Sequence, residues 1–190
     1  MTFSKSRIVV LAVATLAVLA LGLRYRDALR KGPAKVTEAP LPAQAKAGPR
    51  PVSLRDGAAR DLSAPSGKLL VVHFWATWCA PCEEELPGLL AWWREAKADP
   101  RIELLAVSVD EEWPTVDGFL AKRSAADLPV ALDPRKEASS AFGTVKFPET
   151  WFLSPKGEVV FHQVGPLDWG STESRTALRT LAAAALGPAS

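Results

Sequence analysis

A chain of 190 residues has room for one well-packed domain and an appendage, but not for two domains of ordinary size. Its hydrophobic fraction of 48% with 23% charged residues is typical of a globular protein, and a formal net charge of +2 is too small to indicate a nucleic-acid partner. Only two cysteines are present, which excludes a scaffold of several disulfides, so the pair must be interpreted from its spacing.

The amino-terminal segment carries an uncharged apolar run at residues 8–23. As a helix this run is about 24 Å long, a little shorter than the ~30 Å hydrocarbon core of a membrane, so it lies between a signal-peptide core and a short transmembrane helix. The only candidate cleavage signal is Ala20-Leu21-Gly22, and no cysteine is present there to carry a lipid. We therefore predict that residues 1–30 form an uncleaved signal anchor, with Arg24, Tyr25 and Arg26 at the membrane boundary.

The orientation of this anchor involves two opposing arguments. More basic residues follow the apolar run than precede it, and the positive-inside rule would then place the carboxyl side in the cytoplasm. That rule weakens when a long folded domain follows, and the cysteine chemistry below favours an exported domain. We expect a single-pass protein of the bacterial inner membrane whose catalytic domain lies in the periplasm, or on the extracytoplasmic side.

Residues 31–51 are rich in proline, alanine and lysine and lack a periodic apolar pattern, which predicts a semi-extended linker. The folded domain is then expected at residues 52–190. It starts with a short apolar run at 69–74, typical of a buried central strand. We predict a helix next, because three glutamates are followed by apolar residues at helical spacing. These apolar residues are Leu86, Leu89, Leu90 and Trp93.

The rest of the domain continues the alternation of strands and helices. We predict a second buried strand at 102–109, helices at 115–124 and 136–142, a hairpin of strands at 150–153 and 158–164, and a final helix at 173–186. This order predicts an α/β fold with a mixed sheet covered by helices on both faces.

Cys79 and Cys82 lie at the predicted junction between the first strand and its helix. Two cysteines at this spacing can close a small disulfide ring, and the first sulfur meets the unpaired N–H groups at the helix start, which lowers its pKa. We expect an exposed Cys79 to attack a substrate disulfide and a shielded Cys82 to resolve the mixed disulfide. The alternative is half of a zinc site, but His73 and His162 have no suitable spacing to further ligands.

The segment FWATWCAPCEEELP at 74–87 resembles the active-site segment of the thioredoxin superfamily, and specifically the ResA, TlpA and DsbE group of membrane-tethered periplasmic thiol-disulfide oxidoreductases. The resemblance covers the whole exported domain and implies a thioredoxin-like fold. It also implies that Phe147-Pro148 is the cis-proline loop packed on the disulfide, and that 165–169 enters the final helix. Without the cysteine pair, Pro148 would be interpreted as an ordinary strand-edge proline.

By the same resemblance, the client-binding residues are Trp78, Pro81, Phe147 and Pro148, and Glu85 is a functional glutamate beside Cys82. A solvated first-turn glutamate is the alternative for Glu85, and it is the interpretation we favour for its two neighbours, Glu83 and Glu84. His73 occupies a position where cytosolic thioredoxins carry a buried acid, and we expect a buried neutral histidine rather than a catalytic one. Trp75 is expected in the core.

These residues favour a thiol-disulfide oxidoreductase that reduces disulfides of exported clients and needs no cofactor beyond its own redox-active disulfide. The resemblance implies a membrane thiol donor, clients such as apocytochrome c or a copper-site assembly protein, and a monomer. A copper-binding chaperone with the same fold is the alternative, but that class uses a CxxxC spacing and a histidine in the loop at Phe147-Pro148, and both are missing. A peroxidase is disfavoured because no isolated peroxidatic cysteine precedes the pair.

Overall fold

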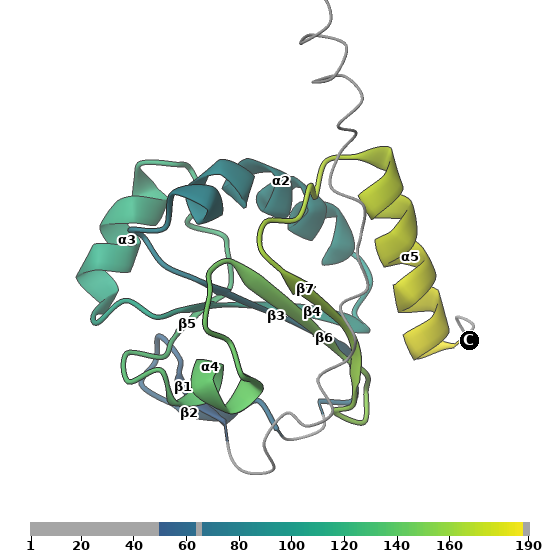
Figure 1. The fold of residues 1–190 in the computed structure, drawn as a ribbon, viewed down its shortest axis with the longest axis horizontal. Helices are drawn as coiled ribbons and strands as arrows, with labels where there is room; N and C mark the ends of the chain where they lie inside the picture. Colours follow the sequence, from purple (N-terminus) through teal and green to yellow (C-terminus); the bar gives the residue numbers. More distant parts are fainter. Residues whose placement is uncertain (1–49, 64–65, 188–190) are drawn as a thin grey trace, which may run out of the picture. The chain divides into compact units, whose positions relative to one another are not determined.

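A mixed sheet with the strand order β2-β1-β5-β4-β3-β6-β7 organises the part of the chain that the computed structural model describes, residues 50–63 and 66–187 (Figure 1). The strands are β1 (Pro51–Ser53), β2 (Ala59–Asp61), β3 (Leu69–Trp75), β4 (Ile102–Ser108), β5 (Val130–Leu132), β6 (Glu149–Leu153) and β7 (Val159–Val164). The helices are α2 (Ala80–Ala96), α3 (Trp113–Ala121), α4 (Glu137–Phe142) and α5 (Thr172–Leu186).

The centre of the sheet is β3, in which all seven residues are buried. It runs parallel to β4, which runs parallel to β5, while β6 lies antiparallel on its other side. A strand with neighbours on both edges and layers on both faces meets water nowhere, which is why its sequence is a continuous apolar run rather than an alternating one.

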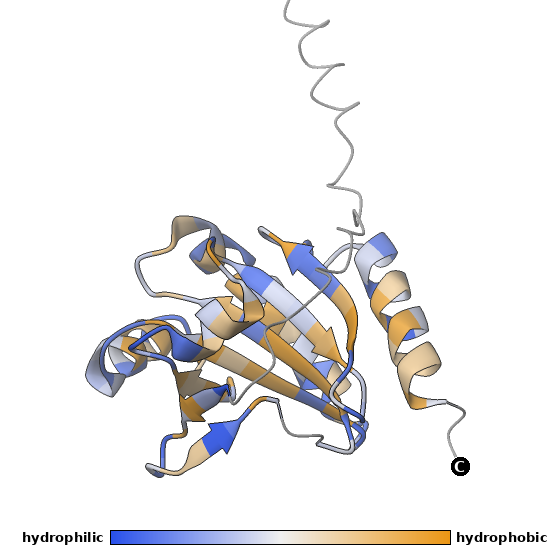
Figure 2. Cartoon of the chain, turned by 60° about the horizontal axis from the view of Figure 1, so that its bottom comes forward, coloured by the Kyte–Doolittle hydropathy of each residue, from blue (hydrophilic) through white to orange (hydrophobic). Residues whose placement is uncertain are grey.

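Each face of the sheet has its own core. Apolar side chains of α2, α3 and α5 pack on the face that carries Val71 and Trp75, whereas Phe142 of α4 and Val52 of β1 pack on the face that carries Val72 and Phe74. Figure 2 shows the hydrophobic residues along the central strands, and alternating hydropathy along α5. Successive residues of β3 point to opposite faces, so this one strand contributes to both cores.

The fold confirms the predicted α/β class and the predicted order of the six longest elements after the cysteine motif, with boundaries that differ by at most three residues. Three strands are missing from the prediction, namely β1, β2 and β5, each only three residues long. β1 begins at Pro51, the last residue of the predicted linker. The predicted anchor at 1–30 lies outside the described residues, and within the described ranges no helix is long and apolar enough to cross a membrane.

Candidate active site

Cys79 and Cys82 form a disulfide at the start of α2, with their Cα atoms 5.3 Å apart. Cys79 is the N-cap: its backbone is extended, and its sulfur accepts the backbone N–H of Cys82 at 3.3 Å. Pro81 lies in the first turn, where a missing N–H costs the helix nothing. The cysteine pair therefore sits at the positive end of a 17-residue helix.

The expectation that Cys79 is exposed is wrong for this disulfide form. Cys79 is 6% exposed and Cys82 is 4% exposed, so both are buried. The physical reason is the capping geometry, because the Cys79 sulfur is turned back onto the helix end instead of outward. Access alone does not distinguish the two thiols, and the assignment of their roles remains a prediction.

The Phe147–Pro148 peptide is cis, as predicted. Glu149, the residue after this proline, opens β6 and pairs with Phe74 near the end of β3, so the loop and the cysteine motif lie at the same end of the sheet. The rings of Trp78 and Phe147 meet edge to face with centroids 6.0 Å apart. The carbonyl of Pro148 accepts the N–H of Gly165 at 2.9 Å, which ties the loop to the end of β7.

Exposed apolar side chains gather around this loop. In the described part of the chain the large hydrophobic residues with high exposure are Trp78 at 64%, Val145 at 85% and Val164 at 46%. Trp78 contacts Phe147, Val145 precedes Phe147 by two residues, and Val164 pairs with Glu149. Trp75, by contrast, is buried in the core as predicted.

Glu85 is buried on the inner face of α2, one turn after Cys82, so the solvated alternative is excluded for it. Its Oε2 accepts the backbone N–H of Leu167 at 2.8 Å and the indole N–H of Trp169 at 3.3 Å. Burial raises the pKa of this carboxyl to about 7, against the lowering effect of those two hydrogen bonds. A carboxyl with this pKa gains or loses its proton near neutral pH.

The segment before α5 comes close to helix α2, which makes these two hydrogen bonds of Glu85 possible. A Cβ atom at Gly88, in the next turn of α2, would lie 3.2 Å from the Cβ of Trp169. The absent side chain lets the segment before α5 come against α2, which carries Leu167 and Trp169 to the carboxyl of Glu85.

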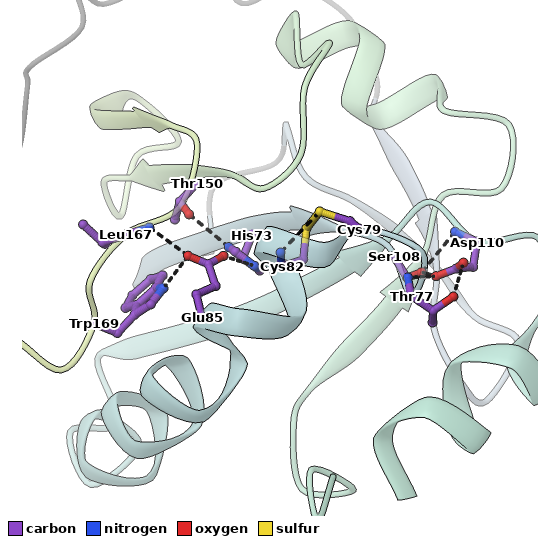
Figure 3. The surroundings of a disulfide bond; sticks show 10 residues. All are labelled: His73, Thr77, Cys79, Cys82, Glu85, Ser108, Asp110, Thr150, Leu167 and Trp169. Carbon is purple, nitrogen blue, oxygen red and sulfur yellow. Dashed lines mark hydrogen bonds and ion pairs between the residues drawn. A yellow bond between two sulfur atoms is a disulfide. The ribbon is translucent and has the colours of Figure 1, made fainter. Parts of the chain in front are cut away.

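His73 is buried in β3, and its burial lowers its pKa to about 3, so the ring is neutral at neutral pH as expected. Its Nε2 lies 3.2 Å from Oε1 of Glu85, and its Nδ1 lies 3.0 Å from Oγ1 of Thr150 on β6. Figure 3 shows the side chains of Thr150, His73 and Glu85 in a row beside Cys82. Sequence reasoning placed His73 in the sheet but did not find this contact.

Asp110 is a second feature that the sequence analysis missed. It follows β4, and its carboxylate accepts the N–H of Thr77 at 2.9 Å and the hydroxyls of Thr77 and Ser108 at 2.8 and 2.6 Å (Figure 3). These bonds hold the turn that leads into Trp78 and Cys79. The available signal was a pair of polar residues, Ser108 and Asp110, at the end of an apolar strand.

The other two glutamates of the first turn face solvent, as predicted. Glu83 and Glu84 are exposed, and Glu83 forms an ion pair with Arg123. Neither therefore places an unscreened charge at the sulfurs. Within the ranges that the structure describes, no group of three or more histidine, cysteine, aspartate or glutamate side chains is arranged to hold a metal ion.

A helix-capping CxxC disulfide, a cis-proline loop at the same end of the sheet and this strand order define a thioredoxin-like domain. The chain belongs to the AhpC/TSA family, whose pattern it matches over residues 43–162.

Similar proteins of known name support the assignment to a thioredoxin-like family. Over 100 residues, 53% of the chain and 55% of the relative, the chain is 33% identical to the thiol-disulfide oxidoreductase ResA of Bacillus subtilis. It is 32% identical over 107 residues to the thiol:disulfide interchange protein HelX of Rhodobacter capsulatus, 56% of the chain and 58% of the relative. The chain thus spans little more than half the length of these relatives.

Solved structures have the same fold. A protein of Chlorobium tepidum, provisionally assigned as the thiol:disulfide interchange protein DsbE, superposes with a TM-score of 0.61 at 27% identity, over 75% of this chain and 96% of that one. StoA of Bacillus subtilis gives a TM-score of 0.58 at 21% identity, over 73% of this chain and 98% of that one, and supports the fold alone.

Proposed function

We propose that the chain is a thiol-disulfide oxidoreductase that reduces disulfides in exported client proteins through Cys79 and Cys82. The observation that carries this proposal is the disulfide at the helix start beside the cis Phe147–Pro148 loop. The names of the relatives, which are oxidoreductases and interchange proteins, support the same reaction class.

The reaction uses the two sulfurs in turn. The Cys79 thiolate attacks one sulfur of the client disulfide, and the other client sulfur leaves as a thiolate that takes a proton from water. Cys82 then loses its proton and attacks the Cys79 sulfur, which releases the second client thiol and closes the Cys79–Cys82 bond. Two electrons pass to the client, each of its two sulfurs takes up one proton from water or from the site, and a membrane thiol donor restores the dithiol.

Glu85 is the proposed acceptor of the Cys82 proton. It lies one turn after Cys82, it is buried, and its pKa of about 7 lies between those of a carboxylic acid and a thiol. A proton can therefore move to it from the resolving thiol without large cost in either direction.

The client-binding surface is proposed to comprise Trp78, Pro81, Phe147 and Pro148. The exposed ring of Trp78, which contacts Phe147 beside the cis-proline, offers an extended client segment an apolar contact. The exposed side chains of Val145 and Val164 add apolar surface near this loop. Apocytochrome c or a copper-site assembly protein remain the proposed clients, on the resemblance of the active-site segment.

A single-turnover assay tests the activity. The reduced full-length chain in detergent is mixed with a peptide that holds one disulfide, and free peptide thiols are counted after an acid quench. We expect stoichiometric reduction by the wild type, a trapped mixed disulfide with Cys82→Ser, and no reaction with Cys79→Ser. An intact peptide disulfide in the presence of the reduced wild type would contradict the proposal.

The membrane anchor and the extracytoplasmic location are proposed from the sequence. A fusion of alkaline phosphatase to the carboxyl terminus of the full chain tests both, because this enzyme needs an oxidising compartment for its own disulfides. We expect active phosphatase in the membrane fraction. Inactive phosphatase, or activity released into the soluble fraction, would refute the orientation or the anchor respectively.

A further inference from the structure

His73, Thr150 and Glu85 form a buried chain of polar groups across three elements. Each residue is buried, with exposed fractions of 2%, 1% and 8%. The imidazole bridges the other two, since Nδ1 lies 3.0 Å from the Thr150 hydroxyl and Nε2 lies 3.2 Å from Oε1 of Glu85 (Figure 3). The rings of Trp169 and His73 pack edge to face, with their centroids 6.1 Å apart.

The two oxygens of Glu85 have different environments. Oε2 accepts two N–H groups, from Leu167 and Trp169, whereas Oε1 accepts no hydrogen bond and lies against His73 Nε2. A buried carboxyl oxygen without a partner is costly in either charge state. The polar atom that lies against Oε1 is His73 Nε2, at 3.2 Å, so the imidazole is positioned to be its partner.

Glu85, not His73, changes charge in this site. The ring has a pKa of about 3 and stays neutral, while the carboxyl has a pKa of about 7. The titratable groups that face Glu85 are His73 from β3 and Cys82 from its own helix; Leu167 and Trp169, before α5, contribute only uncharged N–H groups. Asp168 bonds to the N–H groups of Gly170 and Ser171 instead.

A neutral imidazole has one donor and one acceptor, and either nitrogen can carry the proton. When Glu85 is ionised, an Nε2–H donates to Oε1 and the Thr150 hydroxyl donates to Nδ1. When Glu85 is protonated, its O–H donates to Nε2 and an Nδ1–H donates to the Thr150 oxygen. Both arrangements keep the Glu85–His73 and His73–Thr150 contacts hydrogen-bonded, and they differ in the tautomer of His73.

We propose that His73 is a positioning residue whose neutral ring changes tautomer with the protonation state of Glu85, with Thr150 as the hydrogen-bonding counterpart. This inference rests on the proposed function only in giving Glu85 the task of exchanging a proton with Cys82. The ring carries no charge at any stage. Its role is to keep the carboxyl satisfied both before and after the proton arrives.

The direct test is nitrogen NMR of the ¹⁵N-histidine-labelled full chain, followed from about pH 5 to about pH 9. The chain has only two histidines, and a His162→Gln variant assigns the signals. We expect His73 to change from the Nδ1–H to the Nε2–H tautomer with a midpoint near the Glu85 pKa of about 7. A ring that keeps one tautomer across this range, or that becomes an imidazolium, overturns the inference.

A Glu85→Gln variant supplies the second readout, because its side chain does not titrate. The tautomer change of His73 must vanish there, while the His162 signals stay as in the wild type. His162 is a matched reference, since it is also buried against a glutamate, Glu149, but stacks on Trp151 on the opposite face of the sheet. A tautomer change that persists in Glu85→Gln overturns the coupling.

Alkylation kinetics test whether the contact of His73 with Glu85 affects the Cys82 thiol. We expect His73→Leu to raise by about one pH unit the midpoint of the Glu85-dependent step in Cys82 alkylation, because an ionised carboxylate loses more than a neutral one when a donor is removed. His73→Gln, whose amide can donate or accept, should restore the midpoint, and His162→Gln should not move it. An unshifted midpoint in His73→Leu overturns the inference, whereas failure of client reduction with the tautomer change intact refutes only the proposed function.

Discussion

Asp110 fixes the backbone of Thr77, two residues before Cys79, through hydrogen bonds from both its N–H and its hydroxyl at 2.9 and 2.8 Å. Asp110 is 5% exposed, so these bonds are shielded from water, and the Ser108 hydroxyl adds a third at 2.6 Å. The end of β4 thereby positions the turn from which Trp78 and Cys79 extend.

Replacement of this carboxylate should therefore destabilise the domain and loosen the turn. We expect Asp110→Ala to lower the free energy of unfolding by about 2 to 4 kcal/mol, because three donors, the N–H and hydroxyl of Thr77 and the hydroxyl of Ser108, lose a charged acceptor. Urea unfolding of the full chain measures this. Asp117→Ala, which removes an exposed ion pair with Arg55, is the control and should change the free energy by less than about 1 kcal/mol. Equal effects of the two variants would contradict this role of Asp110.

The two cysteines should differ in reactivity although both are buried in the disulfide form. Only Cys79 precedes the helix and faces its unpaired N–H groups, so its thiolate is the more stable. With limiting iodoacetamide near neutral pH, we expect the reduced chain to be modified at least about tenfold faster at Cys79, as measured by peptide mass spectrometry. Faster modification of Cys82 would reverse the assigned roles.

Trp78 should contribute to client binding and not to the chemical step. Its ring is exposed and contacts Phe147, but it makes no hydrogen bond to the carboxyl or thiol groups of the site. We expect Trp78→Ala to raise the KM for a disulfide peptide about tenfold, the typical effect of removing a central aromatic anchor, with little change in kcat. Trp78→Phe should retain most of the affinity. A loss confined to kcat would place Trp78 in the chemistry instead.

The raised pKa of Glu85 also predicts how its contribution to stability depends on pH. The folded state holds this proton up to a pKa of about 7, whereas the ordinary pKa of a glutamate is 4.5, so the folded state binds more protons between these values and stability falls as pH rises through them. The free energy of unfolding of the wild type minus that of Glu85→Gln should therefore decrease from about pH 4.5 to about pH 7, by on the order of 3 kcal/mol.

Unfolding by urea at several pH values measures this decrease, with the disulfide intact throughout. Glu84→Gln is the matched control, because Glu84 is the exposed neighbour of Glu85 in the same helical turn. Its difference from wild type should not vary over this window. A difference for Glu85→Gln that grows with pH would mean that the folded state favours the ionised carboxylate.

The sequence was sufficient for the elements that form the site, and less so for the contacts between them. β3, α2 and β4 could be predicted because each has a continuous apolar run or a helical period over seven residues or more. β1, β2 and β5 have three residues each, too few for a period, and depend on pairings such as that of Ser53 with Leu132. The contact of His73 with Glu85 depends on how α2 lies across β3, which no local pattern encodes.

The direction of electron flow is the last prediction. Of the three glutamates at the helix start, Glu83 is paired with Arg123 and Glu84 is exposed, so Glu85 is the one whose charge can act on the thiolate. An ionised carboxylate buried one turn from Cys82 opposes the helix dipole and disfavours a thiolate. A less stable thiolate means a more stable disulfide and a lower potential, which is the property of a reductant.

A redox titration of the full chain against dithiothreitol and glutathione, beside Glu85→Gln, measures this effect. We expect a wild-type potential nearer about −270 mV than about −120 mV, and an upward shift of at least about 30 mV in the variant, which corresponds to about 1.4 kcal/mol for a two-electron couple. The shift should be larger at pH 8 than at pH 6, because the carboxyl with a pKa of about 7 is ionised only at the higher value. A wild-type potential near about −120 mV would defeat the reductant assignment. A potential and cysteine pKa unchanged in Glu85→Gln would show that the charge of Glu85 does not set the direction.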